Sequence, residues 1–553
     1  MASRRALGGV CGLLAAAAGL GVAEGLAAAI SGPSPVVSVG TWVIDTSPSA
    51  LTHWAIEHFR ADDKKVLVTG VLSTVALFAA VAGAIGVKAR RVALAMTAAL
   101  GLVALVAVAT VRGSHGDALV RITPALVALL VSTIALDRLL RALPDATVTP
   151  PAPVPEPVPA LRATLSVRDR VDAPGPGPGP GATIVERPAV IIPGRRRDGG
   201  IQRREFVRVA GAVGTLALGG GLVRELAGSS HSRAGVVARL PAPYSPARTV
   251  TGADFGLPGL APYFSANGDF YRVDTSIQVP ELDARTWELR IDGMVENPVT
   301  IRYADLLAAR LIERDVTLTC VSNEVGGDLI GNARWLGLPV RDLLAAARPK
   351  PGADAIRSHS ADGWTAGTPL SALTDPGRDA MLAIGMNGVA LPAQHGYPVR
   401  MVVPGLYGYV SATKWVVRLE VTRFDAFQAY WTSRGWAPQG PIKTESRVDV
   451  PKSYPGVRLG AGTIAGMAWA QHRGIEKVEV AVDDGAWRPA TLAAWNNPDT
   501  WRQWRLDWTA PAGTHNLAVR ATDATGAVQV AANAPPPPDG ATGYDTVSVQ
   551  VTA

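Results

Sequence analysis

Residues 315–332 read DVTLTCVSNEVGGDLIGN, and this stretch decides how the second half of the 553-residue chain is interpreted. The alternation up to Thr319 predicts a strand, and the Gly-, Asn- and Asp-rich run after Cys320 predicts a loop. A cysteine at the end of a strand, entering a Gly-rich loop, is expected to be presented rather than packed. Such a thiol can act as a nucleophile, a redox sensor or a soft metal ligand, although free cysteines are also common as inert packing.

The cysteine count narrows these choices. The chain has 2 cysteines, and the other one, Cys11, lies in an apolar N-terminal run. This count excludes a disulfide framework, a CxxC zinc site, a cysteine-ligated iron–sulfur cluster and a CxxCH haem attachment within the chain. A nucleophilic cysteine needs a nearby base. His359 and His395 are available for that role, but the sequence has no cysteine-hydrolase signature.

The first 142 residues have the composition of a membrane region. The chain is 48% hydrophobic and only 18% charged, which indicates membrane segments beside globular ones. Four apolar stretches are each near the length that crosses a hydrocarbon core of about 30 Å: Ala6–Ile30, Val66–Val87, Val92–Val111 and Leu119–Leu136. Buried helices of a soluble bundle are the alternative, but they would show a polar face. The sequence therefore predicts a four-span α-helical transmembrane bundle over residues 1–142.

Lys and Arg in the short loops predict the orientation, because they concentrate on the cytoplasmic side. They precede the first span, separate the second span from the third and follow the fourth: Arg4, Arg5, Lys88, Arg90, Arg91, Arg138 and Arg141. Residues 31–65 then lie outside, although Lys64 and Lys65 weaken the bias slightly. This outer segment carries several aromatic and ionisable side chains: Trp42, His53, Trp54, Glu57 and His58. The spacing of His53 and His58 matches one helical face poorly, so it offers little support for a haem there.

A Pro-, Gly- and Arg-rich stretch predicts a cytoplasmic linker over residues 143–202. Arg203 and Arg204, one spacer, Phe206 and an apolar run then resemble a twin-arginine export signal, except that the signal is internal and Gln202 stands where Ser or Thr is usual. A plain fifth span is the alternative, and both place the C-terminal half outside. We expect residues 203–230 to remain as an anchor. The net charge of +7 and the Arg-rich run at 195–204 fit this topology better than nucleic-acid binding.

The C-terminal half changes to the pattern of a soluble protein. Residues 245–440 mix strand-like and helix-like segments, which predicts an α+β domain that includes helices at Tyr303–Arg310 and Val340–Ala347. We call it the catalytic domain because it contains the candidate thiol Cys320. Residues 441–553 are all strand-like, with short alternating segments that predict an antiparallel sandwich of the immunoglobulin-like type. Three tryptophans are expected in the cores: Trp335, Trp415 and Trp504.

Several motifs in residues 250–553 occur in the order typical of one family. They are Leu318–Asn323 around Cys320, Gly331–Leu343, His395–Gly405 followed by Lys414 and Trp415, and, in the tail, Gly474–Asp483 with Trp501–Trp504. Together they resemble the sulfite oxidase family of molybdenum enzymes, in which the C-terminal sandwich serves as a dimerisation domain. The resemblance implies a molybdopterin cofactor and a possible homodimer. The membrane half is not part of the family's common core.

The resemblance also implies roles for particular residues. Cys320 matches the thiolate that ligates molybdenum, and Arg272, with Arg334 as a second candidate, matches the cations that position an anionic substrate. The remaining matches are to residues that hold the cofactor, with Ser360 the weakest: Asn267, Tyr271, Arg272, Ser360, His395, Arg400, Ser411, Thr413 and Lys414. Arginines suit phosphate groups because their planar fork binds them in a bidentate way.

One departure concerns Trp364, which stands where sulfite-oxidising members have a tyrosine beside the molybdenum. An indole N–H is a donor only, so proton-coupled steps assigned to that tyrosine would need another group. The resemblance predicts oxygen-atom transfer with a small sulfur-containing or other oxo-acceptor substrate and a separate haem- or quinone-linked electron partner. A sulfoxide reductase on the same cofactor is one alternative. A cofactor-free surface binding module is an alternative of another class.

Overall fold

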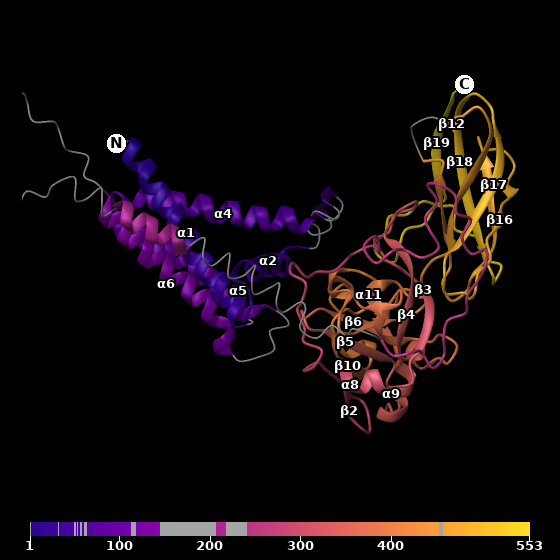
Figure 1. The fold of residues 1–553 in the computed structure, drawn as a ribbon, viewed down its shortest axis with the longest axis horizontal. Coiled ribbons are helices and arrows are strands. Elements are labelled where there is room, and N and C mark those ends of the chain that lie inside the picture. The colour runs from indigo at the N-terminus through magenta and orange to yellow at the C-terminus, as the bar shows by residue number, and fades with distance from the viewer. Residues whose placement is uncertain are drawn as a thin grey trace, which may run out of the picture.

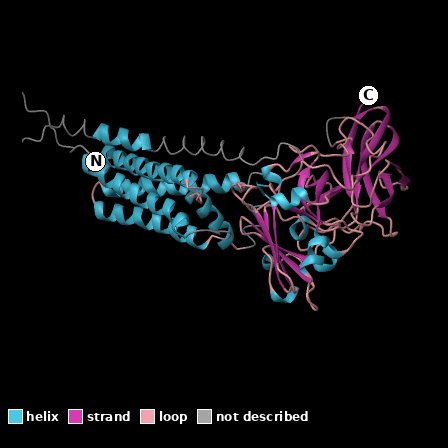
Figure 2. Ribbon diagram, turned by 60° about the horizontal axis from the view of Figure 1, so that its bottom comes forward, coloured by secondary structure: helices cyan, strands magenta, loops and turns pink. Residues whose placement is uncertain are grey.

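The computed structural model describes residues 2–30, 32–48, 51, 54–55, 58–59, 63–111, 118–143, 206–216, 240–452 and 457–552. Helices make up the N-terminal part, and strands dominate the C-terminal half (Figures 1 and 2). The linker predicted at 143–202 lies almost entirely outside the described residues, and so do Arg203 and Arg204. Of the predicted anchor, the structure describes the helix Phe206–Leu216, which is shorter than the membrane-spanning candidates.

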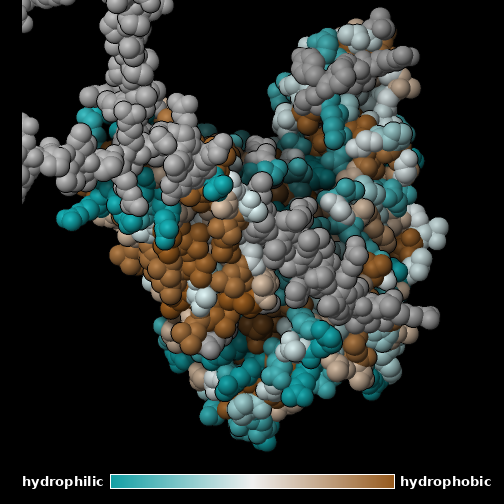
Figure 3. Space-filling model, turned by 60° about the vertical axis from the view of Figure 1, so that its left-hand side comes forward, coloured by the Kyte–Doolittle hydropathy of each residue, from teal (hydrophilic) through white to brown (hydrophobic). Residues whose placement is uncertain are grey.

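The N-terminal helices form a bundle that matches the predicted spans. Its members are α1 (Ala2–Ala29), α2 (Pro35–Thr46), α4 (Asp63–Gly86), α5 (Arg90–Thr110) and α6 (Ala118–Ala142). Within the described residues, 4 helices are long and apolar enough to cross a membrane: Arg4–Ala29, Lys64–Gly86, Arg90–Thr110 and Ala118–Ala142. The outer face of the bundle is broadly hydrophobic, whereas the rest of the visible surface is a mosaic (Figure 3).

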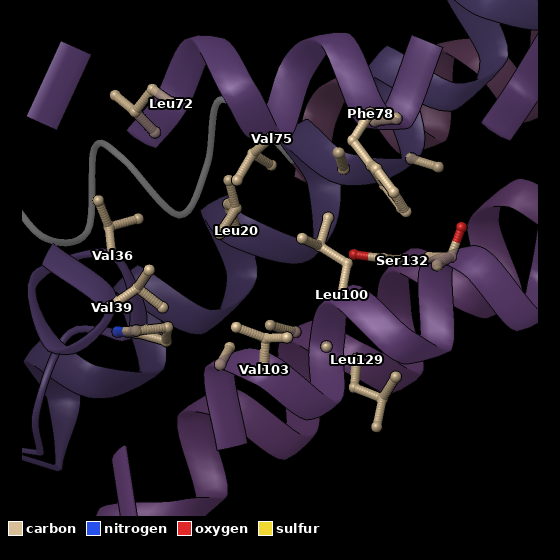
Figure 4. Close-up of a pocket in the computed structure, with 18 of the residues that line it drawn as sticks. Leu20, Val36, Val39, Leu72, Val75, Phe78, Leu100, Val103, Leu129 and Ser132 are labelled. Carbon is tan, nitrogen blue, oxygen red and sulfur yellow. The ribbon is translucent and has the colours of Figure 1, made fainter. Parts of the chain in front are cut away.

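Glycines let the helices of the bundle approach closely. A Cβ added at Gly12 would overlap the carbonyl oxygen of Ala79, and one added at Gly83 would overlap that of Gly8, so α1 and α4 touch through backbone. Small residues at such crossings are typical of helix packing in lipid. An apolar cavity of about 100 Å³ remains among the helices, with Leu20, Val75 and Leu100 on its wall (Figure 4).

The segment between the first two spans contains a helix that the sequence pattern did not predict. In α2, the Ser34 side chain accepts a hydrogen bond from the Val37 amide (3.2 Å), and Pro35 occupies the start of the helix. Both features are typical helix-start signals. The helix lies at the end of the bundle that faces the catalytic domain (Figure 1).

The catalytic domain contains two sheets with short helices between the strands. One has the order β2-β1-β10-β5-β6 and contains a parallel pair, β1 with β10. Its strands are β1 (Glu288–Gly293), β2 (Val299–Arg302), β5 (Ala355–Ser360), β6 (Thr365–Pro369) and β10 (Val416–Thr422). The other has the order β3-β4-β7-β8, with β9 paired to β7. Its strands are β3 (Ile312–Thr319), β4 (Ile330–Pro339), β7 (Met381–Met386), β8 (Val389–Ala390) and β9 (Arg400–Val402).

The short helices of this domain include both that were predicted. They are α8 (Tyr303–Ala308), α9 (Val340–Ala347), α10 (Leu370–Thr374), α11 (Gly408–Ser411) and the 3-10 turns η2 (Ala393–His395), η3 (Phe424–Ala426) and η4 (Thr432–Arg434). Trp335 and Trp415 are fully buried in the domain, as expected.

The described C-terminal residues form two further sheets. One has the order β11-β13-β17-β16, and the other has the order β12-β19-β18-β14-β15. The strands are β11 (Glu445–Val450), β12 (Val457–Arg458), β13 (Gly460–Trp469), β14 (Ile475–Val482), β15 (Arg488–Pro489), β16 (Thr491–Leu492), β17 (Arg502–Ala510), β18 (Gly513–Asp523) and β19 (Asp545–Thr552). Ile464, Val480, Trp504 and Val549 from both sheets share one core. The immunoglobulin-like assignment of this part stays a prediction.

Residues on both sides of the predicted domain boundary near residue 440 pack into one hydrophobic core. Met467, Trp469 and Trp501, which follow the boundary in sequence, are buried in the same core as Leu289 and Val403 of the catalytic domain. The C-terminal sheets therefore help to hold the catalytic domain.

The core of the C-terminal sheets yields a first prediction. Trp504 has no exposed surface, so Trp504→Ala should leave a cavity and lower the free energy of unfolding by about 3–5 kcal/mol. The measurement is chemical or thermal denaturation of the purified protein. Val530→Ala is the control, because Val530 is 54% exposed and its loss should change stability by less than about 0.5 kcal/mol. Equal stability of the two variants would contradict this packing.

Candidate active site

Cys320 follows β3 directly, as the sequence pattern predicts. Its amide donates to the carbonyl oxygen of Leu329 (2.9 Å), and the Leu329 amide donates to Asn323 Oδ1 (2.8 Å), so the intervening loop is closed on itself. The expectation that the thiol is presented was wrong, because Cys320 is only 8% exposed. Burial raises the pKa of this thiol, while hydrogen bonds from Ser322 and the charge of Lys414 oppose the rise.

The loop before the first strand brings Asn267 and Tyr271 to the same region. Asn267 Oδ1 accepts a hydrogen bond from Asn387 (2.8 Å), and its carbonyl oxygen accepts one from His395 Nε2 (2.8 Å). Tyr271 stacks on Phe270 with ring centroids 5.2 Å apart. Burial raises the pKa of the Tyr271 phenol, and the nearby charge of Cys320 raises it further, so the phenol stays protonated.

His395 is a neutral imidazole at ordinary pH. It lies in η2, is 1% exposed, and uses Nε2 to donate to the carbonyl oxygen of Asn267. The pKa of His395 is lowered to about 4, mainly by burial and in addition by the positive charges of Arg400, Lys414 and Arg272, while the hydrogen bond to Asn267 opposes this shift. This side chain therefore holds two loops together without adding charge.

Arg400 is a buried cation with neutral partners. It starts β9 and is 4% exposed. It donates from Nη1 to the carbonyl oxygen of His395 (3.1 Å), from Nε to that of Met401 (3.4 Å) and from Nη2 to that of Ala412 (3.4 Å). No carboxylate among the described residues forms an ion pair with it. Burial lowers the pKa of Arg400 to about 10. A buried charge without a counter-ion is costly, so this guanidinium fits an anionic group supplied from outside the chain.

Lys414 and Arg272 share a carboxylate that the sequence interpretation missed. Asp274 Oδ2 accepts from Lys414 Nζ (2.8 Å) and from Arg272 Nε (3.0 Å). Burial lowers the pKa of Lys414 to about 8, because the desolvation outweighs the attraction of Asp274. Lys414 also donates to the carbonyl oxygen of Gln394 (3.1 Å), next to His395. The two cations thus lie on the same side of the site as the histidine.

The predicted hydroxyl donors are engaged within the protein. Ser411 donates to the carbonyl oxygens of Leu406 (2.9 Å) and Tyr407 (3.0 Å) in the turn that forms α11. Thr413 shares a 2.6 Å hydrogen bond with Ser358, across to β5. Ser360 accepts from the Asp362 amide at 3.4 Å. All three predicted side chains are buried, and these contacts shape the loops around Lys414 and Arg400.

The structure does not place Arg334 beside Cys320, Arg400 and Lys414, contrary to the substrate role predicted for it. It pairs in register with Asp315 on β3, and its guanidinium grips that carboxylate at 2.7 and 3.1 Å. The strand rise of about 3.3 Å per residue places Asp315 roughly 17 Å from Cys320 along the chain. The pair therefore stabilises the far end of β3. The role predicted for Trp364 beside the metal stays a prediction; its amide donates to Asp362 Oδ1 (3.0 Å) in the turn after β5.

Three site residues escaped the sequence interpretation. Asp274 had a weak signal, because a carboxylate two residues after Arg272 can pair with it. Asn387 had a clearer one, since Asn before Gly388 is typical of a hairpin turn; its φ of 51° places it in the left-handed region. Asp362 gave none. Burial raises the pKa of Asp362, and the nearby charge of Asp274 raises it further.

Comparisons with known proteins point to one class. Residues 276–431 match the family model described as the oxidoreductase molybdopterin binding domain. The mitochondrial sulfite oxidase of Homo sapiens is 30% identical over 309 residues, which are 46% of this chain and 55% of that protein. The sulfite oxidase of Gallus gallus is 28% identical over 327 residues, or 50% of this chain and 70% of that one. The chain thus spans about half the length of the human relative.

A solved structure was also matched. The crystal structure of the sulfane dehydrogenase SoxCD from Paracoccus pantotrophus is 26% identical in sequence and covers 53% of this chain and 85% of that chain, with a TM-score of 0.47. Taken with the family model, the sequence relatives define a molybdenum oxidoreductase whose cofactor is molybdopterin. Over the matched part of its length, the chain resembles the sulfite oxidase family of those enzymes.

The residues present fit that cofactor. Arg400 offers a buried cation that pairs with no carboxylate in the described part of the chain, and Arg272 and Lys414 add positive charge beside it. Cys320 is a soft ligand of the type that molybdenum accepts. Within the described residues no group of three or more His, Cys, Asp or Glu side chains can hold a metal ion.

The neutral His395 gives a pH-dependent prediction for the cofactor-free protein. Its pKa is about 4 in the folded protein, against 6.5 for an ordinary histidine, so between these pH values the unfolded chain binds a proton that the folded chain does not. Stability should therefore fall as the pH falls from 6.5 to 4, by on the order of 3 kcal/mol. Thermal denaturation across this range measures it.

The control for this experiment is His395→Gln, whose amide can still donate to the carbonyl oxygen of Asn267 but does not titrate. The variant should lose most of the acid-side slope that the wild type shows. Identical slopes in the two proteins would mean that folding does not lower the pKa of His395.

Proposed function

We propose that this chain is a membrane-anchored enzyme that transfers an oxygen atom between a molybdenum centre and a small sulfur-containing substrate. The observation that carries the proposal is the combination of Cys320 with Arg400, a buried guanidinium that no carboxylate among the described residues neutralises. When bound, the cofactor supplies two-electron redox and oxygen-transfer chemistry. The protein then binds and orients the cofactor and the substrate and determines the electrostatic environment of the site.

The proposed roles of the residues follow from their contacts. Cys320 would ligate the metal, and Arg400 would balance the anionic cofactor from a dry position. His395, neutral and hydrogen-bonded to Asn267, would keep the cofactor loops in register. Lys414 would contact the cofactor's anionic groups, and Arg272, with a side chain 38% exposed, is accessible to an anionic substrate such as sulfite.

The reductive direction is the second candidate, favoured by one residue. Trp364 replaces the tyrosine of sulfite-oxidising members, and its indole can donate a hydrogen bond but cannot exchange a phenolic proton. A sulfoxide of the methionine sulfoxide type would then be the substrate. Ferricyanide-dependent turnover of sulfite, compared with reduced-viologen-dependent turnover of sulfoxides, separates the two directions.

The membrane assignment and the electron partner belong to the same proposal. The four apolar helices support a multi-pass protein, and the Lys and Arg distribution supports an extracytoplasmic catalytic half. Contacts of Asp45 and Lys64 with the catalytic domain support a location of both on one side of the membrane. A separate haem- or quinone-linked protein would exchange electrons, and the C-terminal sheets would provide a homodimer contact.

A molybdenum assay tests the proposal against a cofactor-free binding module. Wild-type protein from a host with an intact cofactor pathway should contain about one molybdenum per chain, with pterin released on denaturation. Cys320→Ser should lower turnover by more than about 100-fold, because a thiolate ligand is lost. Molybdenum retained in the Cys320→Ser variant would still agree with the proposed function, because the other residues that contact the cofactor remain.

The second cysteine supplies a matched control. Cys11 is buried in α1, away from the catalytic domain, so Cys11→Ser should keep both metal and turnover. Wild-type protein without molybdenum would favour the binding module, which predicts normal behaviour for Cys320→Ser as well.

The export route gives a separate prediction. If the internal twin-arginine pattern is used, replacing Arg203 and Arg204 by Lys should leave the catalytic half on the cytoplasmic side, because that route requires the arginine pair. Protease protection in membrane vesicles measures its location. The positive charge is unchanged, so a plain fifth span should orient normally in the variant, and that result would count against the twin-arginine route.

A further inference from the structure

The segment between the first two membrane helices touches the catalytic domain at three places. Lys64, at the start of α4, forms an ion pair with Asp274. Asp45, near the end of α2, lies 3.5 Å from the Arg434 guanidinium. A Cβ added at Gly40 would lie 2.6 Å from Cδ1 of Ile277, so α2 and the loop after Asp274 are in close contact. The three contacts form one interface beside the cofactor site.

Asp274 is the central residue of this interface. Its carboxylate is 6% exposed and accepts hydrogen bonds from three cations: Lys64, Arg272 and Lys414. Burial alone would raise the pKa of Asp274, but Lys414 and Lys64 hold it well below the usual range. The carboxylate is therefore charged at every ordinary pH.

A charged carboxylate at this position opposes the function of its two other partners. Arg272 and Lys414 are the cations that we assign to the anionic substrate and cofactor, and a carboxylate beside them weakens their pull on any anion. Lys64 supplies a third cation and so restores the positive balance. It also fixes one side of the carboxylate, which leaves Oδ2 to hold Arg272 and Lys414 in place.

The second ion pair keeps the interface together. The side chains of Asp45 and Arg434 are only 13% and 11% exposed, so the pair is largely desolvated. Arg434 also lies 3.7 Å from the centre of the Tyr430 ring and donates to the Tyr430 carbonyl oxygen (3.0 Å). These contacts with Tyr430 fix the orientation of the Arg434 side chain independently of Asp45.

We propose that Lys64 of the membrane half is a positioning residue of the cofactor site, acting through Asp274 on Lys414 and Arg272. The membrane half thereby contributes directly to how tightly the site holds anions. The identity of these anions rests on the proposed function. The contact itself does not.

The test uses the full-length protein in detergent and compares Lys64→Gln with Lys65→Gln, which removes an exposed lysine one position along α4. Lys64→Gln should release molybdopterin about fivefold faster after dilution and raise KM for sulfite about fivefold, with kcat within about twofold. Lys65→Gln should match the wild type. Lys64→Arg should restore most of both values, because it returns the charge.

A double-mutant cycle decides whether Lys64 acts through Asp274. In an Asp274→Asn background, Lys64→Gln should have little further effect on cofactor release. If Lys64→Gln accelerated molybdopterin release just as much in the Asp274→Asn background, the proposal would be overturned. An unchanged release rate and an unchanged KM in the Lys64→Gln single variant would also overturn it.

The same cycle, followed by thermal denaturation of cofactor-free protein, measures the contact independently of the cofactor. A wild type without molybdopterin would refute the proposed function and leave the coupling between positions 64 and 274 measurable. No coupling in that measurement would refute this inference, whatever the cofactor content.

Discussion

The unpaired charge of Arg400 is the constraint on which the rest of the site depends. Its guanidinium is almost completely buried, donates hydrogen bonds to backbone carbonyl oxygens and lies 5.0 Å from the centre of the Trp335 ring, and no described carboxylate forms an ion pair with it. A chain that folds around such a cation gives up stability unless an anion arrives. The loops that carry Arg400, His395 and Lys414 are held by hydrogen bonds to each other and to Asn267, so the cation cannot easily turn towards solvent. Cofactor binding and folding are therefore expected to be coupled in this protein.

The architecture places these loops where two sheets end. Cys320 leaves β3, Arg400 starts β9, and Ser411 and Thr413 lie between β9 and β10. Strands fix the positions of their terminal residues more firmly than isolated loops do, which suits a site that must hold a metal ligand and several donors together. Buried hydroxyl contacts, such as that of Thr413 with Ser358, tie the loops back to the neighbouring sheet. Met467 and Trp469 of β13 complete the core beneath, so the C-terminal sheets contribute to the stability of the site.

The sequence was sufficient for features that have local signals. The strand before Cys320, the four apolar helices and the buried tryptophans follow from alternation, length and hydrophobicity. Residues that act through distant partners could not be found in this way. The role of Asp274 depends on its contacts with Lys64 and Lys414, which are 210 and 140 positions away in the sequence. Arg334 was misjudged for the same reason, because its β-sheet partner Asp315 is visible only in the register of β3 and β4. Exposure of Cys320 likewise depended on packing that no local pattern records.

The contact between α2, α4 and the catalytic domain changes the meaning of the membrane half. A Pro- and Gly-rich tether would only keep the domain within reach of the membrane, because such linkers set distance and not orientation. Ion pairs at Asp45 and Asp274, with the close approach at Gly40, select one orientation. That orientation covers Asp274 and leaves part of the Arg272 side chain exposed. For this chain, the placement of the helical bundle and the geometry of the candidate site thus depend on one interface.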